Sequence, residues 1–224
     1  MAELRTIEVG PRDKADACVI WMHGLGADGH DFEPIVPELG LPAGSAVRFI
    51  FPNAPVRPVT VNGGLPMRAW YDIINIGVKA DEDVEGTRES EAQIIRLIER
   101  ESERGVPAAK IVLAGFSQGG AIALHTGVRY SQRLAGIMAL STYVPLRGLL
   151  EEERHPVNAD VPIFMAHGSF DGVVPFDYGK LSRDLLKSLG YAVDWHEYAM
   201  EHSVNMQEVR DIGAWLTKVL QLSA

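Results

Sequence analysis

A serine flanked by glycines stands where an apolar run gives way to a helical pattern, in the segment Gly115-Phe116-Ser117-Gln118-Gly119. The apolar run predicts a strand over Ile111–Gly115, and the pattern after it predicts a helix over Gln118–Tyr130. A serine hydroxyl is a poor nucleophile, so it must be presented on a strained strand-to-helix turn where a base can reach it. The alternative is an incidental serine in a glycine-rich turn, and the strand and helix around it argue against this. The segment therefore predicts Ser117 as a nucleophile.

Short apolar runs elsewhere predict further strands, and their continuous character indicates that these strands are covered on both faces. These runs lie at Ala17–Met22, Ala46–Phe51, Leu134–Leu140 and Val161–Ala166. The alternating residues of Leu4–Val9 predict an edge strand, and Ala192–Tyr198 is predicted as one more strand.

Segments of helical period lie between the predicted strands. They predict helices over Gly86–Arg104 and Tyr178–Leu189, and a final helix that Ser203 or Asn205 could cap. Strands that alternate with helices imply a mostly parallel central sheet flanked by helices. No linker or composition shift marks a boundary, so we expect a single α/β domain over residues 1–224.

Charge and hydropathy restrict the partners of the chain. The 21 Lys and Arg residues face 30 Asp and Glu residues, which gives a net charge of −9. This excess of negative charge opposes binding to nucleic acid or to anionic bilayers. No apolar stretch approaches the roughly 18 residues of a membrane span, so we expect no stable membrane anchoring and a cytoplasmic location.

Chain order restricts the partners of the predicted nucleophile. Where a serine follows a strand in this way, the acid comes next along the chain and the histidine last. Asp171 follows the predicted strand Val161–Ala166, and although its Asp-Gly pair is also a turn signal, its position favours the acid. His202 lies between the last strand and the final helix, and it alone of the histidines meets both requirements. We expect Asp171 to orient His202, which acts as the base.

Two backbone N–H groups are expected to form an oxyanion hole. The Gln118 N–H lies at a helix N-terminus, where unpaired donors and the helix dipole favour negative charge. The Leu25 N–H belongs to the glycine loop that follows the strand Ala17–Met22. His23 in this loop is assigned to loop shape. We find no H-E-x-x-H motif or clustered ligands, so we expect no catalytic metal and no cofactor.

The motifs taken together closely resemble the phospholipase/carboxylesterase family, which includes acyl-protein thioesterases. The resemblance spans nearly the whole chain and rests on His23-Gly24-Leu25-Gly26, Pro52-Asn53-Ala54-Pro55, Trp70-Tyr71-Asp72, Gly115-Phe116-Ser117-Gln118-Gly119-Gly120, His167-Gly168 with Asp171 and Val174-Pro175, and His202-Ser203. It implies an α/β-hydrolase fold without a large lid domain and an acyl-enzyme mechanism. It further implies short to medium acyl esters, lysophospholipids or S-acylated proteins as substrates, and it is compatible with a homodimer.

The region Pro52–Ile76 fits neither the strand nor the helix period, and long irregular loops are usually functional, so we interpret it as part of a substrate-binding surface. The resemblance implies an acyl-binding surface formed by the Asn62–Trp70 loop together with Tyr143 and Val173. The residues assigned to this surface are Leu65, Met67, Trp70, Tyr143 and Val173, and core packing is the alternative for each. The chain departs from the family at Glu201, where relatives often have proline, and at Tyr143, where they often have tryptophan. Both departures bear on substrate preference.

Other functions remain open on sequence grounds. A non-catalytic ligand-binding protein can share this fold, because a fold does not imply a function. A peptidase or lactone hydrolase can share the same three side chains. Esters and thioesters pass through the same acyl-enzyme, so the sequence leaves the physiological leaving group undetermined.

Overall fold

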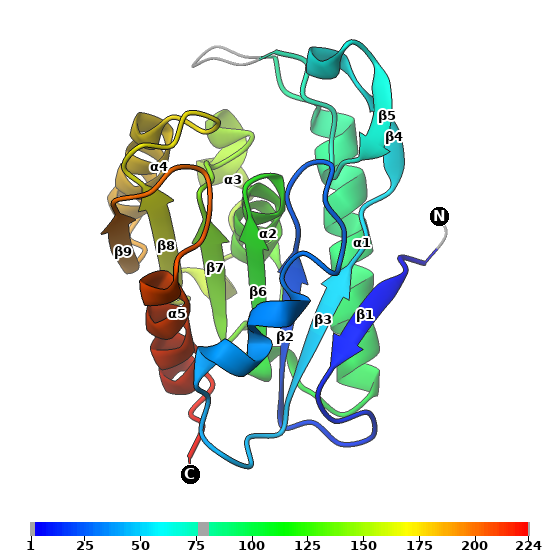
Figure 1. Cartoon of the computed structure of the whole chain (residues 1–224), viewed down its shortest axis with the longest axis vertical. Helices are drawn as coiled ribbons and strands as arrows, with labels where there is room; N and C mark the ends of the chain where they lie inside the picture. The colour runs from blue at the N-terminus through cyan, green and yellow to red at the C-terminus, as the bar shows by residue number, and fades with distance from the viewer. Residues whose placement is uncertain (1–2, 76–80, 224) are drawn as a thin grey trace.

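A seven-stranded sheet forms the centre of the computed structural model, which describes residues 3–75 and 81–223 (Figure 1). Across the sheet the strands are β1 (Thr6–Val9), β3 (Val47–Pro52), β2 (Ala17–Met22), β6 (Ile111–Phe116), β7 (Gly136–Leu140), β8 (Ile163–Gly168) and β9 (Val193–Tyr198). Only β1 pairs antiparallel in this sheet, and it lies at the edge. The mostly parallel sheet is therefore confirmed, and the carboxyl ends of its parallel strands meet at the upper edge in Figure 1.

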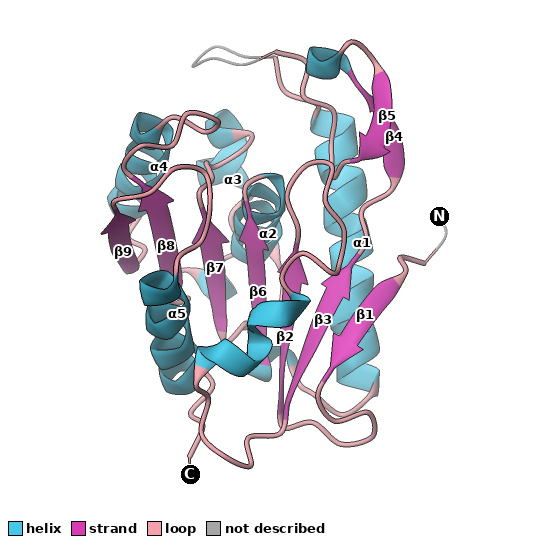
Figure 2. Cartoon of the chain, in the orientation of Figure 1, coloured by secondary structure: helices cyan, strands magenta, loops and turns pink. Residues whose placement is uncertain are grey.

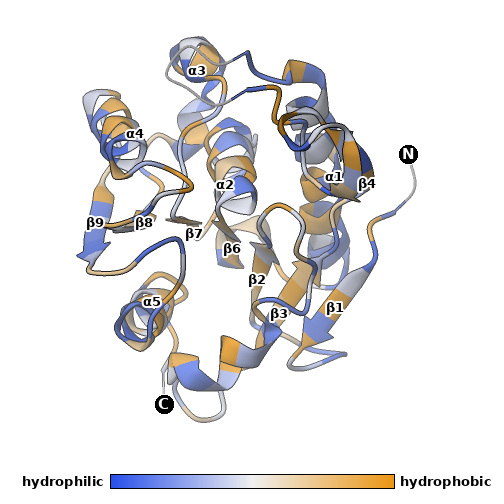
Figure 3. Cartoon of the chain, turned by 45° about the horizontal axis from the view of Figure 1, so that its top comes forward, coloured by the Kyte–Doolittle hydropathy of each residue, from blue (hydrophilic) through white to orange (hydrophobic). Residues whose placement is uncertain are grey.

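Helices cover both faces of the sheet (Figure 2). One face carries α1 (Val84–Glu103), α2 (Gln118–Arg129), the short α3 (Leu150–Glu153) and α4 (Phe176–Ser188), whose apolar side chains join one buried cluster. The other face carries α5 (Met206–Val219) and a 3-10 helix over Glu33–Leu39, which join a second cluster. Every residue of β2, β3 and β8 is buried, which explains their continuous apolar character. Figure 3 shows the apolar colouring of β2 and β3, beside helices whose ribbons mix polar and apolar residues.

The predicted elements agree with the structure to within two residues at most ends. The region Pro52–Ile76 differs, because it contains an antiparallel hairpin of β4 (Val56–Val59) and β5 (Leu65–Arg68). Pro58 and Pro66 are paired in this hairpin, and proline in a strand argues against a sequence-based strand assignment. The last residue of that region, Ile76, lies outside the described residues. The 3-10 helix was also not predicted, since its prolines obscure any helical period.

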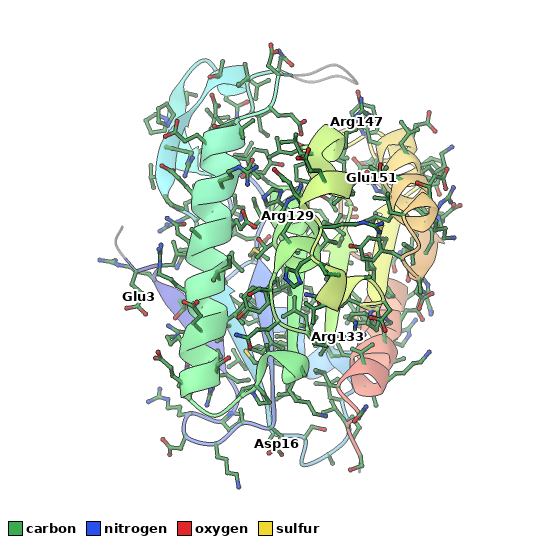
Figure 4. All side chains as sticks on the ribbon, turned by 180° about the vertical axis from the view of Figure 1, so that it is seen from behind. Glu3, Asp16, Arg129, Arg133, Arg147 and Glu151 are labelled. Carbon is green, nitrogen blue, oxygen red and sulfur yellow. The ribbon has the colours of Figure 1, made fainter. Side chains whose placement is uncertain are left out.

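Charged side chains join the helices on the rear face, which Figure 4 shows. Arg129 of α2 donates from Nε to Glu153 of α3 at 2.8 Å. Arg88 of α1 forms an ion pair with the same carboxylate. Two cations hold the pKa of Glu153 below its ordinary value against the opposing effect of burial. The short α3 is therefore tied to both longer helices beside it.

A carboxylate is buried without a partner in the first turn of α5. Glu208 is fully buried, and neither of its carboxylate oxygens has a hydrogen-bond partner among residues 3–75 and 81–223. Burial, with a smaller contribution from the charge of Asp211, raises the pKa of Glu208 to about 8. Ionisation of this group thus opposes folding.

We expect the Glu208 carboxyl to lower the free energy of unfolding as pH rises from 5.5 to 8, because the unfolded chain ionises this group at lower pH than the folded chain. Over that interval Glu208→Gln should lose less free energy of unfolding than the wild type, by on the order of 2–3 kcal/mol. Urea unfolding at the two pH values measures this difference. Equal losses in the two proteins would contradict the raised pKa.

Candidate active site

Ser117 occupies a tight turn between β6 and α2. Its backbone has φ 53° and ψ −120°, a left-handed conformation that a residue with a side chain rarely adopts. Two glycines make the turn sterically possible. A Cβ at Gly115 would overlap the backbone of Gly119, and a Cβ at Gly119 would overlap the carbonyl oxygen of Met22. The turn leaves Ser117 partly exposed and lining a cavity, as a nucleophile requires.

The acid and base predicted from chain order lie within hydrogen-bonding distance of each other. Asp171 follows β8, and its Oδ2 lies 2.7 Å from Nδ1 of His202. Its Oδ1 accepts hydrogen bonds from the N–H groups of Val173 at 2.9 Å and Val174 at 2.8 Å. A carboxylate that accepts two backbone N–H groups is fixed in place, so its second oxygen is available to orient the imidazole. The structure therefore brings Asp171 and His202 together.

The imidazole of His202 lies beside the turn that carries Ser117. Its ring centroid is 4.6 Å from that of Phe116, the residue directly before the serine. The loop that carries His202 also passes close to the end of β8, because a Cβ at Gly168 would overlap the carbonyl oxygens of Met200 and Glu201. With Nδ1 directed at Asp171, the Nε2 atom is left for proton transfer.

A second histidine contacts the carboxylate of Asp171. Nε2 of His167 lies 2.9 Å from the carbonyl oxygen of Val174 and 3.4 Å from Oδ2 of Asp171. Burial lowers the pKa of His167, so its imidazole favours the neutral form and donates from Nε2 to the carbonyl. His167 thereby closes the loop that holds Asp171. No local pattern predicts this contact, because the position of His167 before the acid loop indicates no particular role.

The two N–H groups expected to bind an oxyanion both lie next to Ser117. A Cβ built on Gly24 would lie 3.5 Å from Cβ of Ser117, which places the glycine loop against the serine. Leu25 and Gln118 both line the same cavity as Ser117. For neither N–H group is an acceptor found in the part of the chain that the structure describes. Free donors at this place can stabilise developing negative charge.

The histidine of the glycine loop is engaged by backbone groups. His23 is buried, its Nδ1 lies 2.7 Å from the carbonyl oxygen of Gly24, and its Nε2 accepts the N–H of Ala54 at 3.0 Å. Burial lowers the pKa of this imidazole, which favours its neutral form. Its carbonyl oxygen accepts the Nε1–H of Trp70 at 2.9 Å. These contacts give His23 a role in the shape of the loop.

A cavity of about 520 Å³ opens beside Ser117 and extends to α4. Tyr143 and Val173, both assigned to acyl binding, line it. Leu65 and Met67 lie on β5 and are not among the described residues of its lining; Leu65 is instead well exposed to solvent.

The assignment of Trp70 to the acyl surface is corrected by the structure. Its side chain is fully buried, and its indole N–H donates to His23 rather than facing the cavity. Its backbone N–H donates to Oε1 of Gln118 at 2.8 Å, while Nε2 of the same amide donates to the carbonyl of Tyr71 at 2.7 Å. Trp70 and the Gln118 side chain therefore support the site from within the core. Neither contact could be inferred from spacing along the chain.

The described residues offer no cluster of three or more His, Cys, Asp or Glu side chains that could hold a metal ion. The site brings together a serine hydroxyl, an imidazole and a carboxylate, with two backbone donors. This combination suits acyl transfer through a covalent intermediate.

The chain is similar over most of its length to known proteins of one family. A family model described as Phospholipase/Carboxylesterase matches residues 5–220. Acyl-protein thioesterase 1 of Yarrowia lipolytica is 43% identical over 89% of this chain and 90% of its own length. Acyl-protein thioesterase 1 of Mycosarcoma maydis is 38% identical over 98% of this chain and 99% of its own. The crystal structure of Zea mays acyl-protein thioesterase 2 matches with a TM-score of 0.86 and 30% identity, covering 96% and 99% of the two chains.

We expect Gly168→Ala to displace the loop that carries His202, because the added Cβ would overlap two carbonyl oxygens of that loop. A displacement near 1 Å should lower kcat/KM for a p-nitrophenyl ester by about 10²-fold. Gly172→Ala is a matched control on the next loop, since its Cβ would meet no atom within 4 Å. Full activity in a folded Gly168→Ala protein would show that this close approach does not position the histidine.

Proposed function

Because the chain belongs to the phospholipase/carboxylesterase family of α/β-hydrolases, we propose that Ser117, His202 and Asp171 carry out its hydrolytic reaction. The chain is a serine hydrolase of the ester and thioester class. The observation that supports the residue assignment most strongly is the 2.7 Å contact between Asp171 and Nδ1 of His202, beside the strained turn at Ser117. This geometry leaves one imidazole nitrogen free for the serine proton.

The first half of the proposed reaction forms an acyl-enzyme. Nε2 of His202 takes the proton of Ser117 as its Oγ attacks the acyl carbonyl, and Asp171 stabilises the imidazolium that forms. The carbonyl oxygen becomes an oxyanion and accepts the N–H groups of Leu25 and Gln118. The tetrahedral intermediate then collapses, the bond to the leaving group breaks, and His202 delivers its proton to that alcohol or thiol.

The second half releases the acid. His202 takes a proton from water, which attacks the acyl carbonyl bonded to Ser117. The same two N–H groups receive the oxyanion, and the serine leaves with the proton that His202 returns. Every step is an acyl or proton transfer, so the proposed cycle uses water and groups of this chain.

We propose S-acylated proteins as the physiological substrates. This assignment is supported by the names of the relatives, which are acyl-protein thioesterases over nearly the same length of chain. The cavity beside Ser117 is mostly apolar and large enough for an acyl chain of medium length. Small acyl esters and lysophospholipids are the alternatives from the family resemblance.

We further propose that residues 1–224 act as one domain in the cytoplasm. The seven-stranded sheet and the two core clusters that share it support one domain. None of the helices in the described ranges combines the length and apolarity that crossing a bilayer requires. A homodimer stays a prediction of the family resemblance.

We expect Ser117→Ala to lower turnover of p-nitrophenyl butanoate or hexanoate by about 10⁴ to 10⁶-fold, because it removes the nucleophile. Ser169→Ala is a matched control, since this serine is exposed on the loop that precedes Asp171. Hydrolysis measured with a metal chelator present should be normal in the control. Near-normal turnover by Ser117→Ala would remove the basis of the residue assignment.

The substrate class is tested by release of an S-acyl group from a peptide that carries a single acylated cysteine. We compare kcat/KM for this thioester with that for the oxygen ester of the matching serine peptide and with that for a lysophospholipid. The proposal predicts that the thioester peptide has the highest kcat/KM and that Ser117→Ala abolishes the reaction. A higher kcat/KM for the lysophospholipid would assign the site to lipid hydrolysis instead.

A further inference from the structure

Two tyrosine hydroxyls meet in the wall of the cavity beside Ser117. The phenol oxygens of Tyr71 and Tyr143 lie 2.9 Å apart, and both residues line the cavity. The wall around them is mostly apolar and includes Val144 and Leu185. In an apolar pocket a few polar groups determine which ligands fit, so this hydroxyl pair can distinguish one acyl group from another.

The turn at the nucleophile fixes the position of both tyrosines. The Gln118 side chain donates from Nε2 to the backbone carbonyl of Tyr71 at 2.7 Å. Thr142, directly before Tyr143, donates from Oγ1 to the carbonyl of Ser117 at 2.6 Å. Tyr71 is thus hydrogen-bonded directly to Gln118, and Tyr143 directly follows a residue that is hydrogen-bonded to Ser117. The hydroxyl pair is therefore held at a set place relative to the reacting acyl carbon.

One hydroxyl proton of the Tyr71–Tyr143 pair is not used in the hydrogen bond between them. A bond between two hydroxyls uses one O–H donor, and no acceptor for the second is found among residues 3–75 and 81–223. Tyr71 is 5% exposed while Tyr143 is half-buried, so we assign Tyr71 as donor to Tyr143, whose own O–H then faces the cavity. Burial raises the pKa of both phenols, and the charge of Glu82 adds to this, so both remain protonated.

We propose that Tyr143, supported by Tyr71, selects acyl groups that carry an oxygen acceptor along the chain, such as an ether, oxo or hydroxyl substituent. A plain alkyl chain beside Tyr143 shields its O–H from water and offers no acceptor, which is unfavourable. An oxygen at the matching position satisfies the donor. This inference rests on the proposed function, since it concerns the acyl group that Ser117 receives.

The test compares p-nitrophenyl hexanoate and octanoate with analogues in which an ether oxygen replaces one methylene beyond the β-carbon. The ratio of kcat/KM for each ether ester to that for the alkanoate of equal length is measured. For the wild type we expect one ether position to be preferred by about 3 to 10-fold, the effect of one hydrogen bond. Tyr143→Phe should reduce that ratio to about one, whereas Tyr71→Phe should reduce it only in part.

Tyr191→Phe serves as the matched control, because Tyr191 is a buried tyrosine outside the cavity lining. It should keep both the wild-type ratio and the wild-type turnover of the alkanoates. A wild-type ratio near one at every ether position would overturn the inference, and so would a preference that survives in Tyr143→Phe. Hydrolysis of alkanoates by the wild type, and its loss in Ser117→Ala, tests the proposed function separately. Failure of the inference about Tyr143 is therefore distinguished from failure of the proposed function.

Discussion

The site depends on the close approach of the start of α2 to the end of β2. At Gly119 only a hydrogen atom fits, since a Cβ would lie 2.6 Å from the carbonyl oxygen of His23 and overlap that of Met22. This approach brings the N-terminus of α2 beside the loop that carries the Leu25 N–H. It also holds Ser117 at φ 53° and ψ −120°, a sparsely populated region that costs roughly 1–3 kcal/mol for a residue with a side chain. The close approach of α2 to β2 therefore causes both the exposure of the Ser117 hydroxyl and the strain in its backbone.

Hydrogen bonds around the strained turn offset this cost. The N–H of Ser117 donates to the carbonyl of Leu140 at 2.8 Å, and its carbonyl accepts the hydroxyl of Thr142. The Gln118 amide satisfies two backbone groups of the neighbouring Trp70–Tyr71 segment. Each such bond contributes about 0.5–1.5 kcal/mol net, so about two of these bonds are enough to offset the strain. Because these partners come from β7 and from the segment before α1, the turn is stable only in the assembled fold.

This dependence explains what the sequence predicts and what it does not. The strands, the helices and the order of Ser117, Asp171 and His202 follow from local patterns, because apolar runs and turn residues carry that information along the chain. The contact of His167 with the Asp171 carboxylate arises from packing, and no local pattern encodes it. The burial of Trp70 is likewise not encoded in a local sequence pattern. An aromatic residue in a loop of irregular period has the same sequence signature whether it lines a cavity or lies in the core, where the structure places it.

Gln118 belongs to the proposed oxyanion hole and contacts the wall of the cavity that we propose to bind the acyl group. Its backbone N–H faces the site at the N-terminus of α2, while its side-chain amide holds the backbone of Tyr71, whose hydroxyl contacts Tyr143 in the cavity wall. The side-chain amide and the backbone N–H belong to the same residue. A displacement of Gln118 would therefore move the cavity wall and the proposed oxyanion donor together. The proposed oxyanion donor and the proposed acyl-selecting wall are therefore linked through one residue. Such coupling allows binding of a fitting acyl group to improve the alignment of the oxyanion donor, which raises kcat rather than affinity alone.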